Sequence, residues 1–220
     1  MDRYMLDLLT LTGICPILAN AEPDVGVPAA RALMEGGLPV VEVLLKNETS
    51  VANIAAIARE VPEVIVGAGT VLNAEQAKHV IDLGARFLVL PGFSEKVVRV
   101  AQRHDVAVIP GCVTPTEIMM ALDYGIDIVK FFPVYEMGGV NTMAQLNGGP
   151  FPNVRFLVTG GLDGANFLPL LRHRGVLAAG GDWMFQEQDA LRNRDWEQVA
   201  ANTRHSCMNV LDMRSAADKK

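Results

Sequence analysis

A lysine inside an apolar segment is the feature of this sequence with the clearest chemical potential. Lys130 lies in the segment Ile128-Val129-Lys130-Phe131-Phe132, which Pro133 ends. Lysines are seldom buried without a partner or a task, and a desolvated amine loses proton affinity and becomes a nucleophile toward carbonyl carbon. We therefore predict Lys130 as a nucleophile at the end of a buried strand. The alternative is a lysine that packs its stem and keeps its ammonium group in water.

A second ionisable residue, Glu42, interrupts the apolar run at 40–45. Burying a carboxylate costs several kcal/mol unless the group is paired or protonated. Glu42 is therefore either part of a structural ion pair or a general acid–base that works beside Lys130. A Schiff-base mechanism needs such a group, because protons move as the carbinolamine forms and collapses and again as a C–C bond breaks.

Short apolar runs alternate with amphipathic stretches along the chain. Several of these runs are continuously apolar, which is typical of parallel strands covered on both faces. The runs that we predict as strands are 14–18, 40–45, 64–68, 87–90, 107–109, 126–131, 155–158 and 176–179.

Start and stop signals bound the stretches between these strands. We predict caps at Asn73, Ser94 and Thr114, and stops at Gly84 and Gly125. The predicted helices are 2–12, 25–35, 51–60, 73–83, 94–104, 114–124 and 189–213, with a weaker candidate at 163–172.

Eight strand–helix units, with no linker and no shift in composition, predict an α/β fold of the (β/α)₈ TIM-barrel type. We expect a single domain over residues 1–220, with a short N-terminal helix and a polar tail at 214–220 that frays. The alternative fold is an open, doubly wound sheet. In a barrel, functional side chains gather at the C-terminal ends of the strands.

Two of these strand ends carry glycine pairs, Gly160-Gly161 and Gly180-Gly181. The ends of the seventh and eighth strands are the usual phosphate location of such barrels, because glycine lets the backbone approach an anion and a helix N-terminus offers N–H groups. A Gly-Gly pair after a strand is also a common tight turn. Both interpretations stay open at this point.

The composition excludes several classes of function. The 220 residues carry a formal net charge of -6 with a pI near 5.2, which argues against a nucleic-acid partner. No secretory signal pattern and no long apolar run occur, so we expect a cytoplasmic protein without membrane contact. We expect free thiols, no metal and no cofactor. The cysteines are Cys15, Cys112 and Cys207, and no histidine lies at a predicted strand end: His79, His104, His173 and His205.

The strand ends, in this order, resemble those of the pyruvate-type class I aldolases that act on 2-keto-3-deoxy-6-phosphogluconate (KDPG) and 4-hydroxy-2-oxoglutarate (KHG). The resemblance covers roughly residues 13–185, and its most specific motifs are Lys-Phe-Phe-Pro and Gly-Ala-Gly-Thr. The matching segments are GGLPVVEV at 36–43, VGAGTVL at 66–72, PGF at 91–93, IPG at 109–111, VKFFP at 129–133 and VTGG at 158–161.

The resemblance implies a metal-independent lyase that forms an imine between pyruvate and a lysine. It assigns the imine to Lys130 and the proton transfers to Glu42. It also implies a homotrimer and a place in the Entner–Doudoroff pathway, with a small keto acid as substrate. The substrate-binding residues that it implies are Thr70 near the pyruvate moiety, Pro91 and Phe132 in the lining of the site, and Gly160 and Gly161 near the phosphate.

Two positions depart from the family pattern. Lys46 stands where the family has an arginine that receives the pyruvate carboxylate, so the charge is kept but the two-pronged grip is lost. In Gly181-Asp182-Trp183, Asp182 replaces a serine, and a carboxylate repels phosphate and offers it no donor. Either Asp182 turns away or pairs with a cation while phosphate still binds, or the substrate lacks phosphate and its hydroxyls bond to Asp182. The sequence alone favours the phosphorylated substrate.

Two other functions also fit these residues. A phosphosugar isomerase or epimerase would use Glu42 as its base and Lys130 as an electrostatic clamp, without a covalent adduct. A barrel that binds a keto acid without turnover is the other possibility, because a fold does not determine its function.

Overall fold

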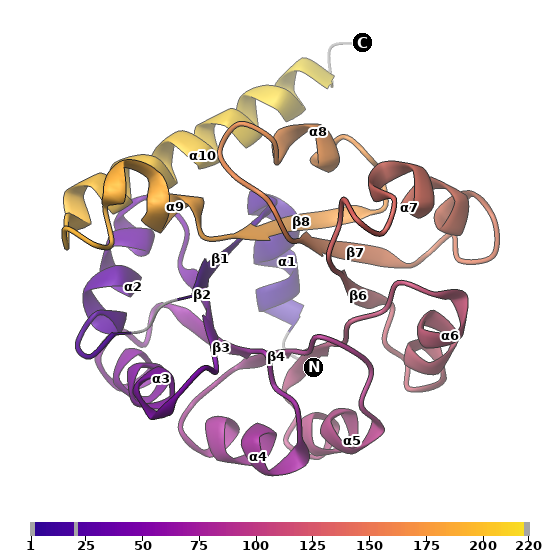
Figure 1. Ribbon diagram of the computed structural model, residues 1–220, viewed down its shortest axis with the longest axis horizontal. Helices are drawn as coiled ribbons and strands as arrows, with labels where there is room; N and C mark the ends of the chain where they lie inside the picture. The colour runs from indigo at the N-terminus through magenta and orange to yellow at the C-terminus, as the bar shows by residue number, and fades with distance from the viewer. Residues whose placement is uncertain (1–2, 20–21, 218–220) are drawn as a thin grey trace.

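The computed structural model describes residues 3–19 and 22–217. Eight parallel strands form a ring with the helices around it (Figure 1). The strands are β1 (Ile14–Leu18), β2 (Val40–Leu44), β3 (Ile65–Gly69), β4 (Phe87–Val89), β5 (Ala107–Ile109), β6 (Ile128–Phe131), β7 (Arg155–Thr159) and β8 (Val176–Gly181).

The ring closes between β5 and β6, at the lysine that the sequence singles out. The hydrogen-bonded order is β5-β4-β3-β2-β1-β8-β7-β6, and Gly111 and Lys130 form a parallel bridge across the remaining gap. The N–H of Lys130 donates to the Pro110 carbonyl at 2.8 Å, and the Lys130 carbonyl accepts from the N–H of Cys112 at 2.9 Å. The predicted (β/α)₈ barrel is confirmed, and the open doubly wound sheet is wrong.

The strands are buried on both faces, as their continuously apolar runs predict. Every residue of β1, β3, β4, β5 and β6 is buried. Side chains on one face fill the interior of the ring, and those on the other pack against the helices. An ionisable residue on such a strand therefore lies inside the barrel or under a helix, away from bulk water.

The helices mostly follow the predicted pattern of one per strand. They are α1 (Arg3–Thr12), α2 (Gly26–Glu35), α3 (Glu48–Glu60), α4 (Ala74–Asp82), α5 (Glu95–Arg103), α6 (Pro115–Asp123), α7 (Gly139–Gly148), α8 (Leu168–Leu171), α9 (Trp183–Gln186) and α10 (Trp196–Ala217), with a 3₁₀ turn, η1 (Glu187–Asp189), after α9. Helix α7 was not predicted, because it starts at Gly138 in a left-handed conformation and has no side-chain cap.

The caps explain most differences at the helix ends. The side chains of Asn73 and Thr114 accept hydrogen bonds from the first turns of α4 and α6, as predicted, whereas Ser94 makes no side-chain cap bond. Helix α3 begins earlier than predicted because Asn47 Oδ1 accepts from the N–H of Ser50 at 3.0 Å. The last helix starts at Trp196, after Asp195, whose carboxylate accepts from the first turn of α10.

Helix α1 covers the amino-terminal end of the barrel. It runs into β1 through Gly13, and its side chains Met5 and Leu9 are fully buried. In the view of Figure 1, α1 lies within the outline of the strand ring. Arg155, the first residue of β7, donates to Thr10 Oγ1 at 3.2 Å, so α1 reaches from β1 to β7. The active-site end is therefore the opposite, carboxyl-terminal end of the strands.

The segment expected to fray is ordered as far as the structure describes it. Helix α10 continues through Ala217, while residues 218–220 of the predicted tail lie outside the described residues. Arg214 donates to the carbonyl of Thr10 at 2.9 Å and also to that of Leu11. These bonds satisfy carbonyls at the end of α1, which is why the helix persists where a polar tail was predicted.

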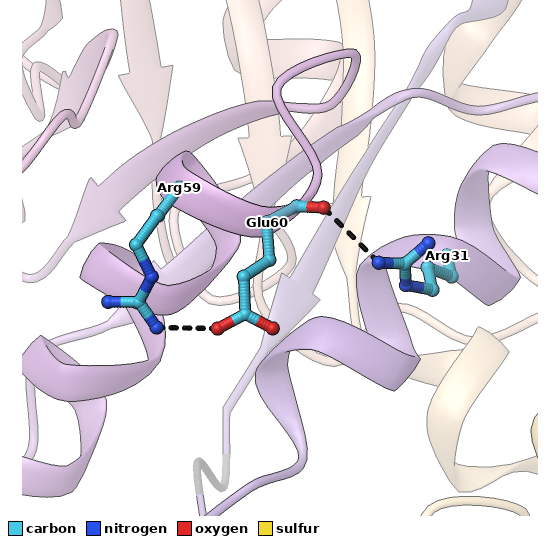
Figure 2. Close-up of polar contacts among 3 residues, drawn as sticks. All are labelled: Arg31, Arg59 and Glu60. Carbon is cyan, nitrogen blue, oxygen red and sulfur yellow. Dashed lines mark hydrogen bonds and ion pairs between the residues drawn. The ribbon is translucent and has the colours of Figure 1, made fainter.

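The outer helices are linked at their ends in a similar way. Figure 2 shows Glu60, the last residue of α3, whose backbone carbonyl accepts from Arg31 of α2 at 3.2 Å. The Glu60 carboxylate pairs with Arg59. Both charged side chains of this pair are largely exposed, so the pair contributes at most about 1 kcal/mol. The Arg31 bond caps a helix end and fixes α2 beside α3.

The remaining sequence expectations concern thiols and membranes. All three cysteines are free, and burial raises the pKa of the Cys112 thiol to about 12. Among the described residues, no helix has the length and apolar character needed to span a bilayer.

Candidate active site

Lys130 lies at the seam of the barrel. Its backbone is held between β5 and β7, since it bridges to Gly111 on one side and pairs in register with Leu157 on the other. The residue is only 7% exposed. Its Nζ lies 5.1 Å from the centroid of the Phe132 ring, where the ring face stabilises a cation. A short strand pinned on both sides therefore holds a buried amine below an aromatic side chain at the mouth.

Glu42 is the most deeply buried acid of the site. It lies on β2 and is 0% exposed. Within the described residues, Oε1 has no hydrogen-bond partner, and Oε2 accepts a long contact from the Cys15 thiol of β1 at 3.9 Å. An unsatisfied carboxylate oxygen inside a barrel is unfavourable unless it serves a ligand or a water molecule. The geometry thus leaves one oxygen of Glu42 available.

The sequence makes room for this carboxylate at Gly69 of β3. A Cβ at Gly69 would overlap Glu42 Oε1 and lie 2.5 Å from a methyl carbon of Leu44. Two residues earlier, a Cβ at Gly67 would run into the Phe87 ring. Strand β3 thus has no side chains at these two positions, which leaves room for the larger side chains of β2 and β4.

Burial and charge act on Glu42 in opposite directions. Burial raises the pKa of Glu42 above its ordinary value of 4.5, and the positive charge of Lys130 and the Cys15 hydrogen bond lower it in part. Burial, followed by the negative charge of Glu42, raises the pKa of the Cys15 thiol well above its ordinary value. Cys15 therefore stays protonated and acts only as a donor. A carboxyl group whose pKa is raised in this way keeps its proton to a higher pH than a free carboxyl group does, so it can give a proton as well as take one.

A further polar atom, Thr159 Oγ1 at the end of β7, is buried and has no partner among the described residues. We did not assign it a role from the sequence, because a threonine at a strand end is common. The sequence feature that could have pointed to Thr159 is its position directly before the Gly160-Gly161 pair.

The predicted pyruvate-binding residues lie around the carboxyl-terminal ends of β2, β3, β4 and β6. Thr70, the first residue after β3, has a positive φ of 58°, which costs about 1 kcal/mol or more for a non-glycine residue and is typical of functional sites. Phe132 is 44% exposed and lies over Lys130. Pro91 and Lys46 are exposed. Lys46 also lines a groove between α3 and α4.

The first glycine pair needs to be glycine for two reasons. Gly160 and Gly161 have positive φ angles of 103° and 67°, which side chains other than glycine adopt with strain. A Cβ at Gly160 would also lie 3.1 Å from the Phe132 ring and from Pro133. Across Gly161 lies the Tyr135 ring, 3.6 Å from the position of a Cβ. The β7 end is therefore packed closely beneath two aromatic rings.

The second glycine pair lies beside the first. Strand register pairs Thr159 with Gly180, so Gly181 and Asp182 leave β8 next to Gly160-Gly161. A Cβ at Gly181 would overlap the Trp183 ring. The two glycine pairs therefore lie on neighbouring strand ends at one side of the mouth, and Asp182 follows Gly181 directly.

No group of three or more His, Cys, Asp or Glu residues placed to hold a metal ion occurs in the part of the chain that the structure describes.

The chain matches a family model for KDPG and KHG aldolase over residues 6–202. The KHG/KDPG aldolase of Escherichia coli strain K12 is 41% identical over 199 residues, which are 90% of this chain and 92% of that protein. The 2-dehydro-3-deoxy-phosphogluconate aldolase of Treponema pallidum is 40% identical over 197 residues, which cover 90% and 93%.

Solved structures give the same result. A Legionella pneumophila KDPG aldolase, with pyruvate captured at low pH as a covalent carbinolamine, superposes with a TM-score of 0.86 at 29% identity, over 91% of this chain and 97% of that one. A Zymomonas mobilis KDPG aldolase with 3-phosphoglycerate superposes with a TM-score of 0.85 at 30% identity, over 94% and 96%. The buried lysine, the glutamate beside it and these matches lead to one conclusion: the chain belongs to the KDPG and KHG aldolase family.

Proposed function

We propose that this protein is a class I aldolase that cleaves a 4-hydroxy-2-keto acid through an imine on Lys130. The observation that carries the proposal is a buried amine, 7% exposed, whose charge acts on a fully buried carboxyl group with an unpaired oxygen. Together they supply the nucleophile and the proton carrier of Schiff-base chemistry.

The proposed substrates follow from the relatives. They are 2-keto-3-deoxy-6-phosphogluconate, which gives pyruvate and glyceraldehyde 3-phosphate, and 4-hydroxy-2-oxoglutarate, which gives pyruvate and glyoxylate. Both contain the same pyruvate half, and they differ only in the aldehyde that leaves.

The proposed cycle starts with neutral Lys130, whose Nζ attacks C2 of the keto acid. Protonated Glu42 gives a proton to the departing hydroxyl, so that water leaves and an iminium forms. Glu42, now ionised, takes the proton of the C4 hydroxyl as the C3–C4 bond breaks; the bond electrons flow to the iminium nitrogen, and the aldehyde leaves. The resulting enamine takes a proton at C3, and water then releases pyruvate and the free amine.

The other predicted residues divide between the two halves of the substrate. We assign the pyruvate carboxylate and its surroundings to the β2, β3, β4 and β6 ends, and the distal half to the β7 and β8 ends. The residues concerned are Lys46, Thr70, Pro91 and Phe132 for the first half, and Gly160, Gly161, Gly181 and Asp182 for the second.

We further propose a homotrimer of single-domain subunits that works in the cytoplasm, in the Entner–Doudoroff pathway. Helix α6 supports association, because it exposes Met119, Met120 and Leu122, and exposed apolar side chains that cluster on one element are typical of interfaces. Light scattering coupled to size-exclusion chromatography gives the subunit number directly.

Borohydride trapping tests the proposed chemistry. The protein is mixed with pyruvate, reduced with borohydride and analysed by intact mass and peptide mapping, with the Lys130→Met variant as a control. We expect one reduced pyruvyl group, on Lys130 and absent from the control. A folded protein that forms no adduct would exclude the imine and leave a non-covalent isomerase, or binding without turnover.

A further inference from the structure

The connections that surround the mouth of the barrel carry very little positive charge. The eight segments between a strand end and the next helix contain one basic residue, Lys46, on the β2–α3 connection. Among the described strands, β6 adds the amine of Lys130, and the iminium that forms there keeps its positive charge at the reacting carbons rather than at the distal half of the substrate. The acidic residues of the same segments are Glu22, Asp24, Glu136, Asp163 and Asp182.

The distal half of the substrate meets the acidic side of this mouth. Asp163 and Asp182 lie on the connections after β7 and β8, next to the paired glycines, whereas Lys46 lies on the connection after β2, which is two strands from β8 in the ring. The Asp163 carboxylate is engaged by backbone N–H groups of Ala165 and Asn166, each at 2.9 Å. Among the described residues, the Asp182 carboxylate accepts one hydrogen bond, from the side-chain amide of Gln186 at 3.4 Å.

Asp182 is held where it is by its neighbour. Trp183 is 2% exposed, its ring stacks on Phe167 at 4.7 Å between centroids, and its Nε1–H donates to Ser206 Oγ at 3.0 Å. Gly181 before it has no space for a side chain. Asp182 is therefore flanked by fixed residues, and a movement of its backbone away from the glycine pairs would break this packing.

A carboxylate in this position discriminates between two kinds of distal group. A phosphate dianion beside Asp182 meets a like charge and finds no donor on that side chain. A hydroxyl group donates to the carboxylate without repulsion. The basic residue of these connections, Lys46, is assigned to the carboxylate of the pyruvate half and not to the distal group.

We propose that this enzyme prefers 2-keto-3-deoxy sugar acids whose distal end is an uncharged, hydroxylated chain, and that Asp182 is the specificity-determining residue that binds those hydroxyls and disfavours a phosphate. The inference rests on the proposed aldolase function but departs from the two substrates inferred from the relatives, whose distal groups are a phosphate and a carboxylate. In this arrangement the distal, hydroxylated end of the sugar acid lies at the acidic side of the mouth, and the reacting carbons lie at Lys130.

A matched pair of substrates tests the inference. The values of kcat/KM for 2-keto-3-deoxygluconate and for its 6-phosphate are measured with the wild type, with Asp182→Ser and with Asp182→Asn. The wild type is expected to cleave the unphosphorylated acid at least as well as the ester, and Asp182→Ser to raise the ester-to-acid ratio tenfold or more. Asp212→Asn, which removes one charge from an exposed position on α10, should leave the ratio within twofold.

Salt gives a second readout that a structural role of Asp182 would not move. Raising the ionic strength screens repulsion between exposed charges, so the ester-to-acid ratio should rise with salt in the wild type and change less in Asp182→Ser. A wild-type preference for the ester of tenfold or more, or a ratio that Asp182→Ser leaves unchanged, would overturn the inference.

Failure of the substrate inference is distinguishable from failure of the aldolase function. If neither substrate is cleaved but the pyruvate adduct forms on Lys130, the substrate class is wrong and the imine chemistry stands. If the adduct itself does not form in the folded wild type, the proposed function is wrong and the inference is overturned with it.

Discussion

The interior of the barrel and its rim are built in different ways. The interior pair, Lys130 and Glu42, sits on strands whose register is set by backbone hydrogen bonds, and both side chains are buried. The rim residues Lys46 and Asp182 sit on connections and are exposed or half-buried. Residues on the strands thus determine the reaction, while residues on the connections determine which substrate is bound.

Electrostatics follows the same division. Charges inside the barrel interact in a medium of low effective dielectric constant, so the pKa of Glu42 responds both to burial and to Lys130. Charges at the rim are screened by water and salt. A substitution inside should therefore change the rate with every substrate, whereas one at the rim should change the ratio between substrates.

The most severe test of this division is the loss of the amine. Lys130→Met should reduce turnover of every substrate by more than about 10³-fold, because it removes the nucleophile, while thermal unfolding shows a folded protein. Lys96→Ala, on the exposed side of α5, should be unchanged in both assays. Substantial activity in Lys130→Met would contradict the covalent mechanism.

Loss of the carboxyl group is the next largest effect. Glu42→Gln keeps the shape of the side chain but cannot carry protons, and it should lower kcat by about 10²- to 10⁴-fold with either substrate. The borohydride adduct with pyruvate should form more slowly rather than vanish. An effect confined to one substrate would place Glu42 with the specificity residues and break the comparison.

The same variant gives a dependence of stability on pH. The pKa of Glu42 in the folded protein is raised by burial above 4.5, so its protonated form favours folding. This contribution is complete below the unfolded pKa and is lost as the pH rises through the folded one. The stability of the wild type relative to Glu42→Gln should therefore fall with rising pH, as measured by urea unfolding at several pH values. If the difference in stability between the wild type and Glu42→Gln did not change with pH, burial would not raise the pKa of Glu42.

Gly69→Ala tests whether the interior depends on space as well as charge. The added methyl group would overlap the Glu42 carboxylate and crowd Leu44, so we expect a loss of about 1–3 kcal/mol of stability and at least a tenfold loss of kcat. Gly148→Ala is the control, because nothing lies within 4 Å of a Cβ there. Unchanged activity in Gly69→Ala would show that Glu42 can work from another position.

The smallest interior effect concerns Cys15. Its thiol hydrogen bond lowers the pKa of Glu42, so Cys15→Ala should raise that pKa and move the limb of the kcat/KM profile that reports Glu42 to higher pH. The change in rate at the optimum should be only a few-fold, since the contact is long at 3.9 Å. Cys15→Ser, which restores a donor, should move the limb back. Identical profiles in all three proteins would remove Cys15 from the site.

The sequence predicted the barrel because its signals are local. Apolar runs at 14–18 and 107–109 match β1 and β5 residue for residue, and Lys130 and Glu42 stood out as charges inside such runs. Contacts between strands were not predictable in this way. The approach of Cys15 to Glu42 and the space that Gly69 leaves depend on the register of three strands, which no short segment specifies.

The long-range bonds that complete the ring have a consequence for how the chain is made. Strand β1 pairs with β8, where Ile14 lies beside Ala179, and Arg214 holds α1 across about 200 positions of sequence. During synthesis, β1 keeps an unpaired edge until β8 has left the ribosome, and such edges invite wrong pairing. Closing so large a loop is slow compared with local helix formation. The edge of β1 that β8 covers is therefore the last part of the barrel to be protected during synthesis.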